Sequence, residues 1–294
     1  MTNNTTYDHI PVMPKEVLTF MDIDPNGKYI DGTCGLGGHS KSILSNLSSN
    51  GFLLGLDVDS DAIKICKKNL NAINPNFHIE KRSYSKFPEV LNELGIGRVD
   101  GILLDLGLSS LQLDSKNRGF SFMEDSKLDM RFNQEGEINA AEIINKSSIS
   151  ELADIMFYFG EERRSRLIAK NIFKKRPIEK VQDLVTIIKK CTPPQKRNKT
   201  MARVFQSFRI AVNNELENLK SFMSEYIKYL KIGGKIIIIS FHSLEDRIVK
   251  HCFRESSKNG DLKILTKKPI MSSKLEQNTN SRSKSAKLRC AVKI

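Results

Sequence analysis

The chain has 294 residues, of which 39% are hydrophobic and 28% are charged, so it is long and apolar enough to bury a substantial core in one large domain or two modest ones. No apolar run approaches the ~18 residues that a membrane-spanning helix needs. The start, Met1 to Tyr7, lacks the charged-then-apolar pattern of a signal peptide, and we therefore expect a cytoplasmic protein.

The net charge of +13 is unevenly distributed. Residues 161–206 hold 14 Lys or Arg against 4 Asp or Glu, a net +10, and residues 246–294 hold 13 against 4, a net +9. The remainder is near −6. Two basic segments on an acidic body indicate a polyanion partner, usually nucleic acid, although a merely soluble basic surface would give the same composition.

The five cysteines are scattered along the chain and never form a Cys-x-x-Cys pair. This pattern favours reduced thiols and argues against a zinc site. Each cysteine is interpreted as a small buried hydrophobe.

In chain order, a helix is expected over residues 14–21, and residues 28–57 then predict the first unit of a nucleotide-binding α/β sheet. One apolar run ends at Asp31, a helix-compatible stretch starts near Ser40, and a second apolar run ends at Asp57. The glycines between the first strand and the helix let backbone approach a ligand closely: Gly32, Gly35, Gly37 and Gly38. Asp57 is placed to accept hydrogen bonds from ribose hydroxyls.

The spacing of these glycines does not match a dinucleotide site. Counting from Gly35 and Gly37, the third position of Gly-x-Gly-x-x-Gly is occupied by Ser40. A pyrophosphate ligand is therefore disfavoured, and a nucleoside ligand without phosphate, S-adenosylmethionine, fits as well or better. A merely tight strand-to-helix turn is the alternative for this stretch alone.

The next elements continue the alternation of helices and strands. A helix with Asp59 as its N-cap precedes a strand over residues 77–81, and a helix over 87–94 precedes a strand over 99–105. Tyr84 lies just past the carboxyl end of the third strand, where open parallel sheets bind ligands. Its ring could stack on an adenine, or it could be an ordinary half-buried tyrosine.

Asp105 ends the fourth strand, which is nearly all apolar, as a central parallel strand should be. Burying a carboxylate there costs several kcal/mol unless it has a partner. Asp105 is therefore the best catalytic candidate in the chain, and a cap for the following turn is the alternative.

After Asp114 the pattern changes to irregular chain and then to a helical period from residue 140, which predicts an all-helical insert. A helix to residue 230, a strand over 235–241 and a final antiparallel pair over 262–265 and 286–292 follow. Residues 267–285 are polar and basic, and they are expected to be mobile when unbound.

Eight motifs in this order and spacing resemble those of the bacterial small-subunit ribosomal RNA cytosine-N4 methyltransferases, and they span nearly the whole chain. The motifs are His9-Ile-Pro-Val, Asp31-Gly-Thr-x-Gly-x-Gly-Gly-His-Ser, Asp105-Leu-Gly-x-Ser-Ser-x-Gln-Leu-Asp, Arg118-Gly-Phe-Ser-Phe, Leu128-Asp-Met-Arg, Gly160-Glu-Glu-Arg, Phe205-Gln-x-x-Arg-Ile-x-Val-Asn-x-Glu-Leu and Ile239-Ser-Phe-His-Ser-Leu-Glu-Asp-Arg. The chain departs from the family pattern at three places, residues 126–127, 199–200 and 280–285. We expect these residues to lie in loops or in the basic tail. The departures therefore concern RNA contacts rather than the donor site.

The resemblance implies an α/β fold: a Rossmann-like methyltransferase sheet over residues 1–113 and 206–294, interrupted by a helical substrate-recognition domain over 114–205. It implies S-adenosylmethionine as methyl donor and small-subunit (16S) ribosomal RNA as partner, and it leaves open a homodimer and the choice between free RNA and an assembled particle. Carried over by position, the donor contacts are Gly37, Gly38, His39, Asp57, Tyr84, Asp105 and Gln112.

The implied reaction methylates the exocyclic N4 of a cytidine, a poor nucleophile that needs an acceptor for its hydrogens. Asp105 is the expected catalytic group, with His242 as the next choice, and positioning two substrates in line supplies much of such a rate enhancement. Two other classes of protein are also consistent with the sequence. An NAD-dependent oxidoreductase would use the same sheet, and a non-catalytic RNA-binding protein would need the basic segments but not Asp105.

Overall fold

The computed structural model describes residues 11–74, 76–115 and 117–294. The chain forms two compact units, Met1–Ser109 with Leu216–Ile294 and Ser110–Glu215, here called the sheet unit and the helical unit. His9 of the first motif and Met1 to Tyr7, on which the localisation expectation rests, lie outside the described residues. Within the described ranges, no helix has both the length and the apolar character needed to cross a bilayer.

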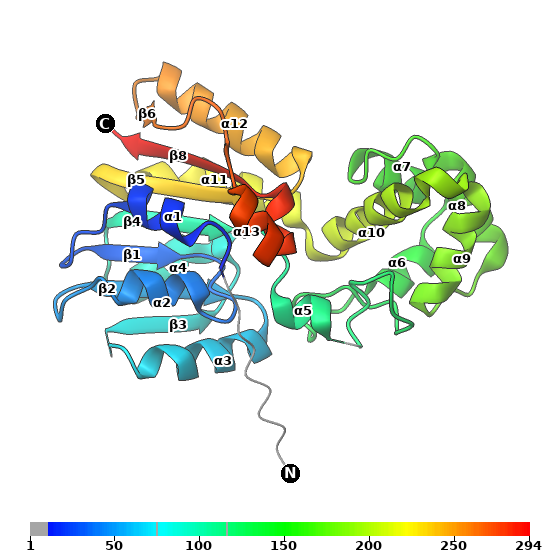
Figure 1. Cartoon of the computed structure of the whole chain (residues 1–294), viewed down its shortest axis with the longest axis horizontal. Helices are drawn as coiled ribbons and strands as arrows, with labels where there is room; N and C mark the ends of the chain where they lie inside the picture. The colour runs from blue at the N-terminus through cyan, green and yellow to red at the C-terminus, as the bar shows by residue number, and fades with distance from the viewer. Residues whose placement is uncertain (1–10, 75, 116) are drawn as a thin grey trace, which may run out of the picture. The chain divides into compact units, whose positions relative to one another are not determined.

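The sheet unit is built on one eight-stranded sheet with the order β3-β2-β1-β4-β5-β8-β6, in which β7 also pairs with β8 (Figure 1). The first five strands are parallel, and β8 is antiparallel to β5. The order reverses between β1 and β4, which is where open α/β sheets bind ligands. The strands are β1 Lys28–Asp31, β2 Phe52–Asp57, β3 Phe77–Lys81, β4 Val99–Asp105, β5 Leu230–Ser240, β6 Leu262–Ile264, β7 Ile270–Met271 and β8 Lys287–Lys293.

Helices cover both faces of this sheet, so the central strands are buried on both sides. On β4, Ile102 and Leu104 pack with α4, α11 and α12, whereas Leu103 packs with α1, α2 and α3 on the opposite face. This two-sided burial explains the nearly unbroken apolar sequence of β4. The helices are α1 Pro14–Met21, α2 Gly38–Leu44, α3 Ser60–Asn71, α4 Phe87–Glu93, α11 Glu215–Tyr229, α12 Ser243–Lys258 and α13 Lys274–Thr279, with the short helices η1 Tyr84–Lys86 and η3 Ser281–Ser285.

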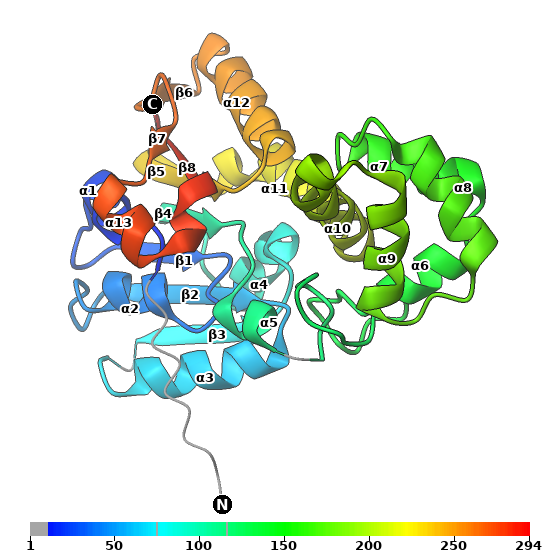
Figure 2. The same cartoon turned by 45° about the vertical axis from the view of Figure 1, so that its right-hand side comes forward.

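The helical unit has its own core of aliphatic side chains from α6 to α10 (Figure 2). Capping boxes begin α6 and α7, where Asn139 and Ser148 accept from Glu142 N and Glu151 N. Each first turn is therefore closed by local side chains. The helices are α5 Ser110–Asp114, α6 Ala140–Lys146, α7 Ile149–Tyr158, α8 Ser165–Lys175, α9 Val181–Cys191 and α10 Arg197–Asn213, with the short helix η2 Pro194–Lys196.

The structure differs from the sequence-based expectation at the far end of the helical unit. α10 runs without interruption through residue 205, so the unit extends to Glu215 rather than to 205. The single helix expected up to residue 230 is two helices, because Asn214 adopts a left-handed conformation with φ of 49° and ends α10. At the near end, the unit begins at Ser110, four residues before the expected position.

The basic segment 267–285 contains regular secondary structure. Its mobility when unbound stays a prediction. The segment forms β7, α13 and η3. Ser273 caps α13 by accepting from Glu276 N, and the Ser272 hydroxyl donates to the Ser283 carbonyl at 2.7 Å. Glu276 Oε1 also accepts from Met13 N at 2.7 Å, which ties α13 to the start of α1. Short-range serine capping thus compensates for the scarcity of apolar residues.

Leu103 and Leu275 form a matched pair for testing where the stability of the sheet unit comes from. Leu103 is fully buried in β4, and Leu275 on α13 is 77% exposed. Leu103→Ala should lower the free energy of unfolding by about 2–5 kcal/mol, because it leaves a cavity between the sheet and α1 to α3. Leu275→Ala should change it by less than about 0.5 kcal/mol. Equal losses in denaturant unfolding would contradict this account of the core.

Candidate active site

Three neighbouring strands of the sheet each end in an aspartate. β2 ends at Asp57, β1 at Asp31 and β4 at Asp105, and the sheet order places these strands side by side. Because the three strands are parallel, their carboxyl ends meet at one edge. Asp31 is 1% exposed, and the side chain of Asp105 is 17% exposed. Three carboxyl groups are therefore held near one another with little access to water.

The loop between β1 and α2 connects all three strand ends through hydrogen bonds. Gly35 N donates to Asp57 Oδ2 at 2.8 Å, and Thr33 N donates to Asp31 Oδ1 at 3.3 Å. The Thr33 hydroxyl accepts from Asp105 N at 2.6 Å. This loop thereby fixes the spacing of the acids.

Two glycines of this loop are required by geometry. Gly37 has a φ of 91° and caps α2, and a Cβ there would lie 3.1 Å from Cys66 Sγ. A Cβ on Gly32 would lie 2.4 Å from Leu104 Cδ2. Ser40, which occupies the third position of the dinucleotide pattern, is fully buried, and its hydroxyl donates to Asp31 Oδ2 at 2.6 Å. The Ser40 hydroxyl therefore stabilises one carboxylate of the acid cluster.

The three acids differ from ordinary aspartates in their proton affinity. Burial raises the pKa of Asp31 and of Asp57 to about 6, although hydrogen bonds from Ser40 and Thr33 oppose the shift at Asp31, and those from Asp59 N and Gly35 N oppose it at Asp57. Burial raises the pKa of Asp105 to about 8, helped by the charges of Asp31 and Glu245. The edge thus favours a positively charged ligand, which would stabilise the ionised acids.

The other predicted donor contacts of the sheet unit lie around these acids. His39, on the first turn of α2 beside Gly38, is 5% exposed, and its Nε2 lies 3.7 Å from Asp105 Oδ2. Tyr84 begins η1 after β3, and a Cβ on Gly32 would lie 3.0 Å from the Tyr84 Cβ. Its ring packs edge-on against Phe222 at 5.8 Å.

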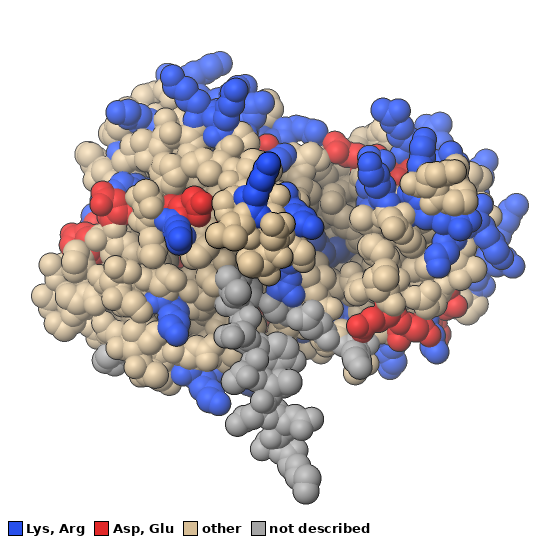
Figure 3. All heavy atoms as spheres, viewed as in Figure 1, with Lys and Arg blue, Asp and Glu red and all other residues tan. Residues whose placement is uncertain are grey.

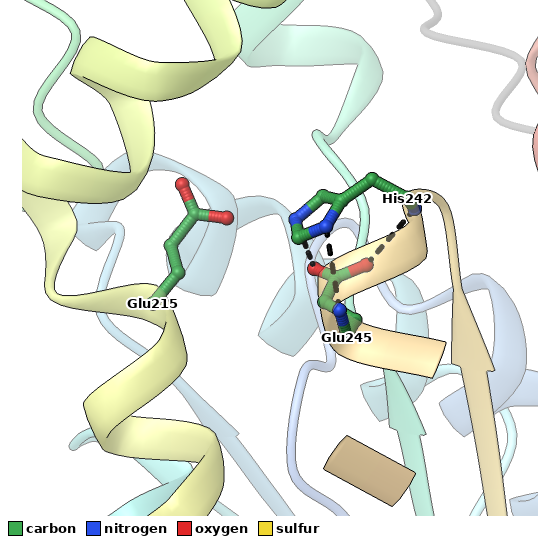
Figure 4. Close-up of side chains that lie close together, drawn as sticks. All are labelled: Glu215, His242 and Glu245. Atoms are coloured by element: carbon green, nitrogen blue, oxygen red, sulfur yellow. Dashed lines mark hydrogen bonds and ion pairs between the residues drawn. The ribbon is translucent and has the colours of Figure 1, made fainter. Parts of the chain in front are cut away.

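The turn after β5 is held rigid by Glu245, a buried residue of α12 (Figure 4). Its Oε2 accepts from Phe241 N at 2.9 Å and from His242 N at 3.3 Å, and its Oε1 lies 3.2 Å from His242 Nε2. The ring of Phe241 lies against Gly107, where an added Cβ would be 2.7 Å from the ring. Figure 4 also shows Glu215, which belongs to the helical unit and whose carboxylate accepts from the Arg209 guanidinium.

The structure brings together six of the seven predicted donor contacts in the sheet unit: Gly37, Gly38, His39, Asp57, Tyr84 and Asp105. Gln112 lies on α5 of the helical unit and is 5% exposed. Sequence reasoning missed Asp31, Thr33 and Ser40 as site residues. The sequence does contain a signal for these residues, because an acid ends the first strand and hydroxyl side chains occupy two positions of the loop.

Comparison with known proteins decides the family of the chain. The family model described as the MraW methylase family matches residues 6–294. The chain belongs to the MraW methylase family. The ribosomal RNA small subunit methyltransferase H of Caldicellulosiruptor saccharolyticus is 46% identical, and the match covers 98% of this chain and 100% of that protein. The protein of the same name from Thermosipho africanus is also 46% identical, with 97% and 98% covered.

A solved structure, an rRNA methylase from Streptococcus thermophilus, is similar with a TM-score of 0.45 and 9% sequence identity, and the match covers 95% of each chain. Likeness at this level adds nothing to the assignment, which rests on the sequence matches.

The raised pKa of Asp105 makes the stability of the fold depend on pH. Between its ordinary value of 3.8 and its folded value of about 8, the unfolded chain loses this proton while the folded chain keeps it. Stability contributed by Asp105 is therefore lost as pH rises. Asp105→Asn removes this linkage. The stability of the variant relative to the parent should increase by on the order of 1–3 kcal/mol between about pH 5 and about pH 7.5 in urea unfolding. A difference that does not change with pH would contradict the burial of this carboxyl group.

Proposed function

We propose that the protein transfers a methyl group from S-adenosylmethionine to the exocyclic N4 of a cytidine in small-subunit ribosomal RNA. The observation that carries the proposal is Asp105, which ends a central strand beside the glycine loop. Its Oδ1 is buried and accepts no hydrogen bond from any described residue. The name of the 46% identical relatives supports ribosomal RNA as the substrate. A substrate of this kind implies a cytoplasmic protein.

The donor is held, on this proposal, by the loop and the three acids. Each Asp57 oxygen accepts one backbone N–H, from Gly35 and from Asp59. A carboxylate has about four lone-pair sites, so Asp57 keeps capacity for two ribose hydroxyls. Gly37 and Gly38 allow the ligand to approach the backbone, and Tyr84 contributes a ring face for the adenine. His39 and Gln112 complete the proposed contacts.

S-adenosylmethionine supplies an electrophilic methyl group on a positively charged sulfonium. Asp31, Asp57 and Asp105 form a cluster whose ionised state is unfavourable in the free protein, as their raised pKa values indicate. A cation beside them would favour ionisation. Donor binding is therefore expected to convert Asp105 from the protonated acid to the carboxylate that the reaction needs.

Asp105 then acts on the target amine. The N4 lone pair is conjugated with the pyrimidine ring, so the amine is a weak nucleophile. The Asp105 carboxylate accepts a hydrogen bond from N4, which holds the lone pair toward the methyl group. As the new C–N bond forms and the S–C bond breaks, the sulfonium becomes a neutral thioether and N4 loses one proton to Asp105. The pKa of about 8 belongs to the ligand-free protein, and the donor cation is expected to lower it so that Asp105 is ionised and can accept this proton at neutral pH.

The other classes considered from the sequence fit the site less well. A dinucleotide site needs close backbone approach at its third glycine, but that position holds the buried Ser40, whose hydroxyl is engaged by Asp31. A protein that only binds RNA would gain nothing from a buried acid with a raised pKa at a strand end.

Donor binding tests the role of Asp57. Asp57→Ala should weaken S-adenosylmethionine binding about 5- to 150-fold, because a lost acceptor leaves ligand groups unpaired at about 1–3 kcal/mol. Asp100→Ala is the matched control. Asp100 also accepts a backbone N–H, from Lys28 at 2.8 Å, but lies near the start of β4. Calorimetry should show parental affinity for the control. Parental affinity for both variants would remove Asp57 from the donor site.

Single-turnover methyl transfer tests the role of Asp105. With both substrates saturating, Asp105→Asn should slow transfer by at least about 10²-fold, because the amide can neither take the proton nor balance the developing charge. RNA affinity should stay near the parental value. Asp100→Asn, the control on the same strand, should transfer at the parental rate. If the Asp105 variant stays within a factor of a few of the parent, Asp105 is only a donor contact and His242 becomes the candidate.

A further inference from the structure

The outward face of α8 combines exposed basic and apolar side chains. α8 buries Ser165, Ile168, Ala169 and Ile172 against the rest of the unit. Five other residues of α8 are exposed and lie at helical spacings of three or four, so they form one continuous strip. This strip, here called the α8 outer face, consists of Arg166, Leu167, Lys170, Phe173 and Lys174.

The α8 outer face carries positive charge that no acid compensates. Residues 163–176 hold 7 Lys or Arg and no Asp or Glu. Figure 3 shows Lys and Arg gathered over the part of the helical unit where Figure 1 places α7 and α8. Among the residues that the structure describes, Arg166, Lys170 and Lys174 have no ion-pair partner. Two other exposed lysines illustrate the contrast, because Lys146 is paired with Glu142 and Lys220 with Glu217.

An aromatic ring lies within this charge. Phe173 is 48% exposed, and the Arg176 guanidinium lies 4.9 Å from its ring centroid. Leu167, 46% exposed, adds apolar area one helical turn before Lys170 and two turns before Lys174. Phe157 on α7 provides a contrast in the same unit. It is 50% exposed, but the exposed Asp154 lies one turn before it. At Phe173, an exposed ring lies on the same helix as cations that have no ion-pair partner among the described residues.

This combination matches the chemistry of one kind of partner. Cations spaced along a strip fit a phosphate backbone, and an open ring flanked by cations fits the face of an unstacked base. A duplex hides its base faces in the stack and would use only the cations. A protein partner would compensate this positive charge only if the partner were strongly acidic.

We propose that the α8 outer face binds an unpaired segment of the RNA substrate, with Phe173 stacking on a base and Arg166, Lys170 and Lys174 contacting phosphates. The inference rests on the proposed ribosomal RNA substrate and names the form in which the helical unit recognises it. The face is a binding surface remote in sequence from the acids of the sheet unit, so its substitution should leave donor binding unchanged.

The first test compares Phe173→Ala with Phe157→Ala in the full-length chain. The probe is a single-stranded oligoribonucleotide, with a duplex of the same sequence alongside. Phe173→Ala should weaken single-strand binding about 5- to 150-fold, the usual effect of losing one base–aromatic stack. Phe157→Ala removes a ring of equal exposure and should stay within about 2-fold of the parent. Circular dichroism checks that both variants keep their helices. Equal effects of the two substitutions would overturn the stacking contact.

The second test measures the salt dependence of the same binding. Each phosphate contact to a single strand contributes about −0.7 to the slope of log affinity against log salt. Replacing Arg166, Lys170 and Lys174 together by Gln should therefore reduce the slope by about 2. Lys146→Gln, which removes a paired lysine of the same unit, should leave the slope unchanged. An unchanged slope in the triple variant would overturn the phosphate contacts.

A third measurement distinguishes stacking from general attraction. The chain has no tryptophan, so Phe173→Trp introduces a single indole reporter. Its fluorescence should be quenched by the single strand and much less by the duplex. Equal quenching, or binding of an acidic protein in place of RNA, would overturn the proposal.

Failure of this inference is separable from failure of the proposed function. If the parent forms N4-methylcytidine and the α8 variants bind RNA as the parent does, the inference alone fails. If the parent binds the single strand through Phe173 but transfers no methyl group, the proposed reaction fails while the RNA contact stands. S-adenosylmethionine affinity, measured on each variant, should equal that of the parent. A loss of donor affinity would contradict the proposal that the α8 outer face binds RNA independently of the donor contacts.

Discussion

The structure depends on holding three aspartates at one edge of a parallel sheet. Asp57, Asp31 and Asp105 end three adjacent strands, and burial raises the pKa of each. Neighbouring acids add to this rise, Asp57 at Asp31, Asp59 at Asp57, and Asp31 with Glu245 at Asp105. The arrangement persists because the glycine loop supplies two backbone N–H groups to Asp57 and Asp31, and Ser40 supplies a hydroxyl. The ionised acids therefore have an unfavourable electrostatic free energy, which a cationic ligand would lower. This is the physical reason for expecting a sulfonium donor here.

The α8 outer face favours a negatively charged ligand, whereas the acidic edge of the sheet favours a positively charged one. The acids at the ends of β1, β2 and β4 favour a cation, and Arg166, Lys170 and Lys174 favour a polyanion. A methyl transfer from a cationic donor to a nucleic acid needs both. The acids belong to the sheet unit and the cations to the helical unit.

Most of the sheet could be predicted from the sequence because its signals are local. β4 is buried on both faces, so it reads as a continuous apolar run, and Asp59 caps α3 as its sequence position indicates. Asp57 and Asp105 are predicted as site residues because each ends such a run, where Asp57 is placed to accept from ribose hydroxyls and the Asp105 carboxylate is costly to bury. The deep burial of Asp31 was less visible, since its partners Ser40 and Thr33 are ordinary loop residues until the fold brings them together.

Other features depended on information that periodicity does not carry. The break at Asn214 falls inside an uninterrupted helical pattern, and only the left-handed backbone of one residue reveals it. The order in residues 267–285 comes from serine caps and from the bond between Glu276 and Met13 N, partners separated by most of the chain. The cations of α8 belong to the basic segment 161–206 recognised in the sequence, but only the structure shows that Arg166, Lys170 and Lys174 have no ion-pair partner among the described residues.

The most direct test of the account is to identify the methylated atom. Small-subunit ribosomal RNA from cells that lack this protein is incubated with the purified chain and isotopically labelled S-adenosylmethionine, digested to nucleosides and analysed by mass spectrometry. The account predicts label in N4-methylcytidine and in no other nucleoside. Label on a ring carbon, on a ribose or on a different base, with none on cytidine N4, would contradict it.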